Sequence, residues 1–206
     1  MAINQAIVLI DWNNVQARLD ANFHSNPRKR IKPLVLRIQQ EIAHLLSNKT
    51  GGAKFRVSMR VYHGWHQDRI ATQIRTDFEI YQVDEQLART IGSVSFTLGY
   101  AFGNELCCYV DPIPLYNTYR GGGQDKGQKM VDTAIVCDML HYARENPDTF
   151  VIIVSDDDDF LPGIIMAKSW QRRANGKCFQ VRVEKRSLDF VTDDSLSDEV
   201  IYWRMP

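Results

Sequence analysis

The segment TFVIIVSDDDD, residues 149–159, decides the fold of this chain. The stretch from Phe150 to Ser155 is rich in β-branched residues and is typical of a strand buried on both faces of a parallel sheet. A second run of this kind, QAIVLI at residues 5–10, is also followed directly by an aspartate, Asp11. We therefore predict that these two strands lie side by side and parallel at the centre of one sheet.

Segments with helical periodicity alternate with the strands, which indicates an α/β fold. We expect a single three-layer α/β domain, in which helices cover both faces of a mainly parallel central sheet. Residues 112–127, with two prolines and three consecutive glycines, predict a mobile loop. The other expected elements are helices at residues 32–47, 67–91 (continuous or broken once), 130–145 and 160–174, and strands at residues 55–64, 93–102, 105–113 and 177–184.

Composition and charge are those of an ordinary globular protein. The 206 residues include 25 Lys+Arg and 25 Asp+Glu, and 44% are hydrophobic, which excludes disorder as the dominant state. We expect one domain over residues 1–206, with an uninformative tail at residues 185–206. Because the formal net charge is zero, a nucleic acid would have to be bound by local basic patches or through a metal ion.

The sequence predicts a cytoplasmic protein without a membrane partner. No apolar run approaches the ~18 residues of a membrane-spanning helix, and the run at residues 6–10 is too short for the core of a signal peptide. The cysteines show neither a Cys-x-x-Cys pair nor zinc-finger spacing, so we expect reduced thiols. They are Cys107, Cys108, Cys137 and Cys178.

Aspartates follow both buried strands, at Asp11 and at the run from Asp156 to Asp159, and Asp132 opens the helix between them. The carboxyl ends of parallel strands form the ligand-binding edge of an α/β sheet, so these carboxylates should converge. Several carboxylates in one cleft repel each other unless a cation binds them. Oxygen ligands favour Mg²⁺, and the absence of histidine or cysteine beside these aspartates disfavours zinc.

Each aspartate also has a simpler interpretation. An aspartate that follows a strand often caps a helix, and Asp132 could serve only as a negative charge in the first turn of its helix. Asp138 lies six residues after Asp132, about 120° away around the helix. We expect Asp138 to face a neighbouring helix or solvent rather than the acidic cleft.

Three motifs, VLIDWNNV (residues 8–15), KMVDTAIVCD (residues 129–138) and VSDDDDFLP (residues 154–162), occur in this order. Together they resemble the NYN domain family of the PIN-like nuclease superfamily, which includes the LabA-like bacterial proteins. The resemblance covers residues 6–184, and Asp156 stands where the family has glycine. The family motifs D-x-x-N-V, K-x-V-D and S-G-D-x-D-F are matched by Asp11, Asn14 and Val15, by Lys129, Val131 and Asp132, and by Ser155, Asp157, Asp159 and Phe160.

The resemblance implies a metal-dependent nuclease, most often an endoribonuclease, with Mg²⁺ or Mn²⁺ in the acidic cleft. The implied metal ligands and catalytic residues are Asp11, Asp132, Asp157 and Asp159, with Asp159 as a fourth ligand or the ligand of a second ion. Asn14 would orient a ligand or a water molecule by hydrogen bonds. RNA is the implied partner, with single-stranded DNA as the alternative. The sequence does not define the oligomeric state, and a homodimer is one option.

Other residues are weaker candidates for substrate contacts. Lys126 and Lys129 flank the glycine-rich loop and could bind the phosphate backbone, and we expect this loop to order on nucleic acid. Basic clusters at residues 28–30 and 172–173 would suit the same role, but such clusters are usually solvated surface. Trp12 could stack on a base or belong to the core. His63 and His66 lie near the end of a strand, but metal-ion catalysis does not require them.

Two other classes of function stay open. A non-catalytic RNA-binding or regulatory module of the same fold would keep the acidic residues without cleaving RNA. A DNA-acting acidic α/β enzyme is the second alternative. Asp11 stands where a Toprim enzyme needs glutamate, and Asn13 interrupts the D-x-D pattern of a haloacid-dehalogenase phosphatase. A dinucleotide-binding fold is disfavoured because no G-x-G-x-x-G follows the first strand.

Overall fold

The computed structural model describes residues 2–19, 27–84, 88–97, 99–107, 113–121, 127–182 and 200–202. Within these ranges, the central sheet has the strand order β12-β11-β10-β1-β2-β6-β5, and β7 also pairs with β2. Every pairing in this sheet is parallel except that of β5 with β6. The strands are β1 (Asn4–Asp11), β2 (Phe55–Tyr62), β5 (Arg89–Ile91), β6 (Val94–Phe96), β7 (Ala101–Phe102), β10 (Phe150–Val154), β11 (Cys178–Arg182) and β12 (Val200–Tyr202).

The two strands predicted to lie at the centre, β1 and β10, are adjacent and parallel. Their register places Ile10 opposite Val154, and on the other side of β1 Asp11 is opposite Tyr62 at the end of β2. We call the edge at which β1, β2 and β10 end the carboxyl edge. The prediction of a mainly parallel α/β sheet is confirmed, and the residues that follow these three strands emerge together.

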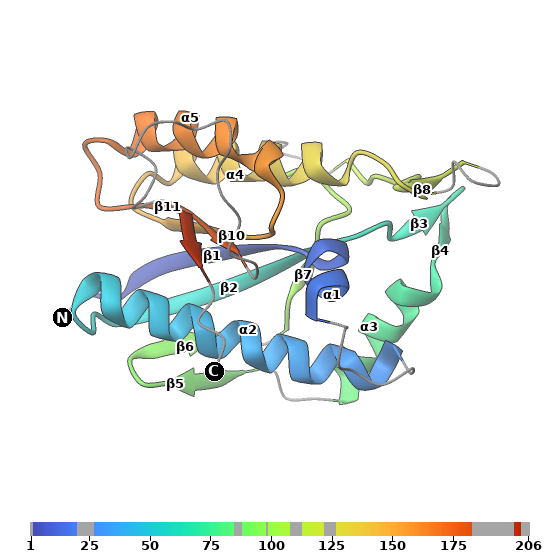
Figure 1. The fold of residues 1–206 in the computed structure, drawn as a ribbon, viewed down its shortest axis with the longest axis horizontal. Coiled ribbons are helices and arrows are strands. Elements are labelled where there is room, and N and C mark those ends of the chain that lie inside the picture. Colours follow the sequence, from blue (N-terminus) through green and yellow to red (C-terminus); the bar gives the residue numbers. More distant parts are fainter. Residues whose placement is uncertain are drawn as a thin grey trace.

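Helices cover both faces of the sheet, in three layers (Figure 1). Strand β1 shows why, because its side chains alternate: Val8 and Ile10 belong to the core under α1, α2 and α3, and Ile7 and Leu9 to the core under α4 and α5. A strand segment covered on both faces has to be apolar throughout, as β1 is from Ala6 to Ile10. The helices are α1 (Trp12–Leu19), α2 (Pro27–Thr50), α3 (Gln73–Asp84), α4 (Val131–Glu145) and α5 (Leu161–Gln171).

The prediction of helix over residues 67–91, continuous or broken once, holds only for α3 and is wrong at both ends. This stretch begins with two short antiparallel strands, β3 (His66–Gln67) and β4 (Ile70–Ala71), and ends in β5. Asp68 and Arg69 form the turn with positive φ angles of 49° and 68°. A helix cannot contain left-handed residues, so α3 begins only at Gln73.

Two other predictions need correction. The strand predicted at residues 93–102 is divided into β6 and β7, with Gly99 at a positive φ of 70° between them. In place of the strand predicted at residues 105–113, the structure has an isolated bridge between Glu105 and Pro114, and residues 108–112 lie outside the described part.

The predicted loop at residues 112–127 contains one strand of a small antiparallel pair, β8 (Tyr119–Arg120), whose partner β9 (Gly127–Gln128) begins at its end. Residues 122–126 lie outside the described part. The predicted mobility of the loop therefore stays a prediction. In the tail, β12 adds an unpredicted parallel strand beside β11. None of the helices in the described ranges is both long enough and apolar enough to cross a membrane.

Candidate active site

Asp11 is the last residue of β1 and lies at the carboxyl edge, with only 5% of its surface exposed. The Ser155 hydroxyl, just beyond β10, donates to Asp11 Oδ2 at 3.0 Å, and the Asn14 backbone N–H in α1 donates to Oδ1 at 3.2 Å. Both carboxylate oxygens therefore accept a hydrogen bond, which fixes the orientation of the side chain. The pairing of β1 with β10 makes this possible, since it brings residues 144 positions apart into contact.

Asn14 connects the two acidic segments. Its side-chain oxygen Oδ1 accepts the backbone N–H of Asp156 at 2.9 Å. Asn14 thereby ties the start of α1 to the aspartate run, a contact that the sequence did not predict. Its predicted role towards a ligand or water stays a prediction.

The aspartate run forms a turn that enters the short 3₁₀ helix η3 (Asp158–Phe160). Asp157 is its N-cap, and its Oδ1 accepts the backbone N–H of Asp159 at 3.0 Å. The Asp157 backbone N–H donates in turn to Ser155 Oγ at 3.2 Å. The capping interpretation and the acidic-cleft interpretation of Asp157 are thus compatible, because a cap occupies only one of its oxygens.

Two buried residues of β11, Gln180 and Arg182, hold this turn, and sequence reasoning missed both. Gln180 Nε2 donates to the backbone oxygens of Ser155 and Asp157, at 3.0 and 2.6 Å. Arg182 forms an ion pair with Asp158. Asp158 therefore has a structural partner of its own, unlike the neighbouring Asp157 and Asp159 of the predicted ligand set. Both side chains are 0% exposed. The sequence signal for them was the presence of a glutamine and an arginine in a strand beside the buried β10, where polar side chains need hydrogen-bond partners.

The predicted aspartates at the carboxyl edge influence one another's pKa values. Burial raises the pKa of Asp11 from 3.8 to about 6; the hydrogen bonds from Asn14 and Ser155 act against this rise, and the charges of Asp132 and Asp157 add to it. Asp132, in the first turn of α4, keeps contact with solvent, and its pKa is raised by partial desolvation and then by Asp157 and Asp159. Asp132 is therefore near enough to Asp11, Asp157 and Asp159 to interact with each, and Asp157 is near enough to Asp11.

The donors at this edge fit a hard divalent cation in their chemistry. All are carboxylate oxygens, and a bound cation would offset the mutual repulsion that adds to the effect of burial on the pKa of Asp11 and Asp132. In the part of the chain that the structure describes, no three His, Cys, Asp or Glu side chains are grouped closely enough to share one ion. Mg²⁺ usually takes only one or two carboxylates and keeps several waters.

Of the residues predicted to bind substrate, some lie in the described part of the chain and others do not. Lys129 is exposed two residues before α4, and its backbone N–H is bonded to Thr118 O at 2.9 Å. Lys126 lies outside the described residues, as do the side chains of residues 28–30. Arg172 lines a hollow with Lys168 and Lys177 near the start of β11, at the end of the sheet opposite to the carboxyl edge. The cluster at residues 172–173 is therefore no part of the acidic site.

The expectation for Asp138 is wrong, because this side chain is fully buried against the sheet. It accepts hydrogen bonds from the Tyr62 hydroxyl at 2.6 Å and from the Cys107 backbone N–H at 2.9 Å, and it forms an ion pair with Arg60 Nε at 2.9 Å. The helical angle did turn Asp138 away from Asp132, but towards two polar residues of β2. Trp12 is 1% exposed and packs edge-on against Phe78, so it belongs to the core.

A parallel three-layer α/β fold with coupled aspartates at its carboxyl edge defines the PIN-like class. The match to the NYN domain covers residues 5–194, nearly the whole chain, and the chain belongs to the NYN domain family. Members of this family are generally nucleases that act on RNA. Comparisons with curated proteins and with solved structures find no match to either.

Proposed function

We propose that this protein is a metal-dependent endoribonuclease that hydrolyses phosphodiester bonds of RNA at the carboxyl edge. The observation that carries the proposal is the electrostatic coupling of Asp11, Asp132, Asp157 and Asp159. These residues come from three separate segments of a chain in a family of nucleases. Structural caps alone would not require carboxylates from three segments to approach one another at a cost in repulsion.

Asp11 and Asp157 are the residues we propose as principal metal ligands, with Asp132 and Asp159 completing the acidic set. Asp11 is held by two hydrogen bonds and Asp157 by its cap, so both are oriented before a ligand arrives. A bound Mg²⁺ or Mn²⁺ would supply activation of a water molecule and neutralise the charge that develops on the phosphate. The exposed Lys129 is available to contact a phosphate beside this edge.

The test measures cleavage of labelled single-stranded RNA and DNA with Mg²⁺, Mn²⁺ or EDTA. Asp157→Asn removes one ligand charge but keeps the oxygen that caps η3, since asparagine is as good a cap as aspartate. We expect this variant to lose cleavage and Mn²⁺ binding while it stays folded. Glu145→Gln, at the far and exposed end of α4, removes a carboxylate elsewhere and should cleave like the wild type.

Three results would contradict the proposal. Asp157→Asn that cleaves and binds Mn²⁺ like the wild type would show that the ligand set is wrong. Wild-type cleavage of DNA in preference to RNA would favour the DNA-acting alternative. RNA binding without cleavage under any metal condition would favour a regulatory RNA-binding module.

A further inference from the structure

Two short β-hairpins, β3 with β4 and β8 with β9, lie beyond the carboxyl edge (Figure 1). We call these two hairpins the arm. Thr118 connects them: its Oγ accepts the backbone N–H of His66 at 3.2 Å, and its backbone oxygen accepts the backbone N–H of Lys129 at 2.9 Å. Lys129 is three residues before Asp132. The arm therefore leads directly into the helix that carries part of the acidic site.

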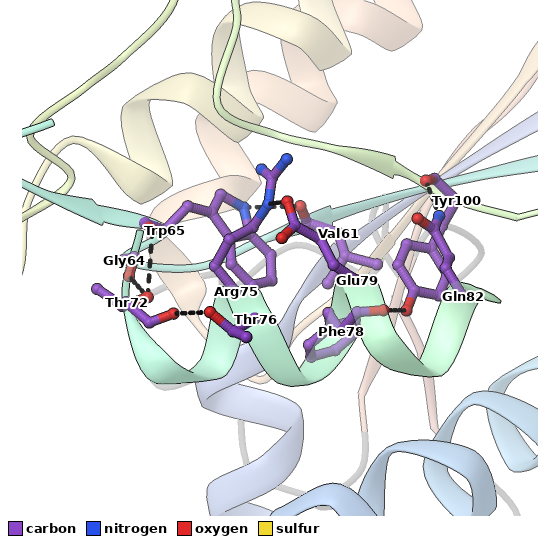
Figure 2. Close-up of polar contacts among 10 residues, drawn as sticks. All are labelled: Val61, Gly64, Trp65, Thr72, Arg75, Thr76, Phe78, Glu79, Gln82 and Tyr100. Atoms are coloured by element: carbon purple, nitrogen blue, oxygen red, sulfur yellow. Dashed lines mark hydrogen bonds and ion pairs between the residues drawn. The ribbon is translucent and has the colours of Figure 1, made fainter. Parts of the chain in front are cut away.

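The hairpin of β3 and β4 is fixed at its base (Figure 2). The Thr72 hydroxyl donates to the backbone oxygens of Gly64 and Trp65 at 2.9 and 3.2 Å, and the Thr72 backbone N–H donates to Trp65 O at 3.0 Å. Trp65 is fully buried and packs edge-on against Phe78. The hairpin therefore projects from an anchored base in the core.

The tip of this hairpin has a backbone conformation that its sequence does not favour. Asp68 and Arg69 have φ angles of 49° and 68°. Two positive φ angles are those of a type I′ turn, in which glycine is usual at the second position. An arginine in the left-handed region is less stable there than glycine would be. Such a residue in an ordered turn indicates a use for its side chain.

The Arg69 side chain lies over the ring of Tyr116 without stacking closely on it. Its Cζ is 6.0 Å from the ring centroid. In the same molecule Arg75 Cζ is 3.5 Å from the centroid of Phe102, which is the distance of direct contact. A flat group that touches a ring on one face and a guanidinium on the other needs about 7 Å between them, two contacts of about 3.5 Å each. The gap at Tyr116 is within about 1 Å of this width.

The Tyr116 ring is exposed and yet held in position. It is 47% exposed, and the neighbouring Ile70 is 72% exposed. The Arg69 backbone N–H donates to Tyr116 O at 3.0 Å, and the His66 ring meets the Tyr116 ring edge-on at 5.9 Å. An oriented ring that faces a guanidinium across such a gap suits a nucleobase, because every base has two flat faces that stack.

The charges of the arm suit a phosphate backbone. In its described residues, 66–71, 116–121 and 127–129, the arm has three cationic side chains, those of Arg69, Arg120 and Lys129, and all are exposed. The one carboxylate in these ranges is Asp68, and Asn117 Nδ2 donates to it at 3.3 Å. Exposed cations that flank an aromatic ring are the combination found where proteins bind single-stranded nucleic acid.

We propose that the arm binds single-stranded RNA beside the acidic site, with one base stacked between the Tyr116 ring and the Arg69 guanidinium. The proposal rests on the proposed function, which places the cleaved phosphate at the acidic site. It defines the substrate class as RNA with unpaired bases, because a base inside a duplex cannot enter the gap. Stacking does not read the edges of bases, so the arm should accept all four.

The first experiment measures the binding of a labelled oligoadenylate of about eight nucleotides by fluorescence anisotropy in EDTA. Metal is absent, so the measurement does not depend on catalysis. We expect the single strand to bind more tightly than the same strand paired with oligouridylate. Tyr116→Ala should raise the Kd of the single strand roughly 5- to 100-fold, and Tyr116→Phe, which keeps the ring, should stay within about 2-fold of the wild type. Equal affinity for single strand and duplex, or wild-type affinity in Tyr116→Ala, would overturn the proposal.

Arg69→Gly separates a binding role of Arg69 from a structural one. Glycine adopts the φ angle of 68° without strain, so the Tm of this variant should be unchanged or higher. The Kd for the single strand should still rise at least about 3-fold, because one face of the gap and one charge are lost. A lower Tm together with unchanged RNA affinity would show that Arg69 only stabilises the hairpin, and would contradict the proposal.

Two control variants carry the same chemical changes elsewhere. Arg144→Ala removes a largely exposed cation at the far end of α4, and Trp170→Ala removes a ring of α5 that is 41% exposed. Neither should change the Kd. If Arg144→Ala weakened binding as much as Arg69→Gly, only the total charge of the protein would matter, and the assignment of the gap would be wrong.

The second experiment measures cleavage of unstructured RNA. Tyr116→Ala should raise KM about as much as it raises the Kd and leave kcat largely unchanged, because stacking holds the RNA equally before and during cleavage. The two proposals fail separately. RNA binding that depends on Tyr116 and Arg69, without cleavage under any metal condition, contradicts the proposed function alone. Cleavage whose KM is unchanged in Tyr116→Ala and Arg69→Gly contradicts the binding role of the arm alone.

Discussion

Asp11→Asn should make the metal-free protein more stable at neutral pH, although it removes a residue of the proposed active site. The pKa of Asp11 rises from 3.8 to about 6, chiefly through burial. At ~1.4 kcal/mol for each pKa unit, this rise corresponds to about 3 kcal/mol of destabilisation when the carboxylate is ionised. Asparagine has the same shape and no charge, so it removes this cost.

The substitution also removes one hydrogen bond, and this loss reduces the net gain in stability. The amide oxygen of the new side chain can still accept the Asn14 N–H, but the amide nitrogen replaces the oxygen that accepts the Ser155 hydroxyl. Loss of that hydrogen bond costs about 1 kcal/mol. The expected gain at pH 7.5 is therefore about 2 kcal/mol, or roughly 4–8 °C in Tm for a chain of this length.

The stability difference between the wild type and Asp11→Asn should change sign with pH. Because the pKa of Asp11 is higher in the folded state than in the unfolded state, the folded wild type takes up a proton first as the pH falls through about 6. Its stability relative to Asp11→Asn therefore rises between pH 7 and pH 4. At pH 4, close to the unfolded pKa of 3.8, most of the cost of ionisation has gone and the lost hydrogen bond outweighs the rest, so the variant should be less stable than the wild type by about 0.5 kcal/mol.

Urea unfolding of both proteins in EDTA at pH 7.5 and pH 4, with Glu145→Gln as the control, measures this difference. The reasoning is refuted if Asp11→Asn is destabilised by the same amount at both pH values, because the carboxylate would then carry no cost of burial. Addition of Mn²⁺ at pH 7.5 should stabilise the wild type and not the variant, if Asp11 is a ligand.

Three further predictions concern the neighbourhood of the site. Asp138→Asn should lower the free energy of unfolding by about 3–5 kcal/mol in urea, because the buried Arg60 loses its charged partner; a change below about 1 kcal/mol would contradict this. Gln180→Ala should lower Mn²⁺ affinity and cleavage roughly 10–100-fold, since it releases the backbone of Asp157; unchanged metal titration would refute it. Gly103→Ala should destabilise by about 1–3 kcal/mol, because its Cβ would lie 2.0 Å from the Tyr62 ring; thermal unfolding measures the loss.

The central strands and the acidic edge could be predicted from the sequence for one physical reason. A strand covered on both faces must be apolar throughout, so β1 and β10 were visible as runs of residues without periodicity. Parallel neighbouring strands end at the same edge of a sheet, and this rule predicts that Asp11 and the aspartate run lie close together. Asp132 followed because α4 runs back along the sheet from that edge. Each step depends on long, strongly patterned segments.

Short elements left no such pattern. The pairs β3 with β4 and β8 with β9 are two residues long on each strand, too short for periodicity to be seen. The stretch at residues 67–91 contains no glycine or proline, so nothing marked the turn at Asp68 and Arg69. Both adopt left-handed backbone conformations that few non-glycine residues accept.

Asp138 shows the limit of periodicity in another way. Its angle from Asp132 gave the direction of the side chain relative to one residue, but burial depends on what the sheet presents in that direction. Strand β2 presents Arg60 and Tyr62, and only the pairing of β2 with β1 shows that both point towards α4. A buried carboxylate requires such partners, and they are 76 and 78 residues away in the sequence.

The same alternation gives the carboxyl edge two sides with different chemistry. Asp11 and Tyr62 turn towards α4, and the residues after them, Trp12 and His63, turn towards α3. The side under α4 gathers carboxylates, which suits a cation and the phosphate that it binds. The side at α3 carries side-chain amides and the imidazole of His63 in place of that acidic set. If the proposed function holds, the cleaved phosphate lies on the α4 side of Asp11, so Asp157→Asn on that side should abolish cleavage of every RNA substrate.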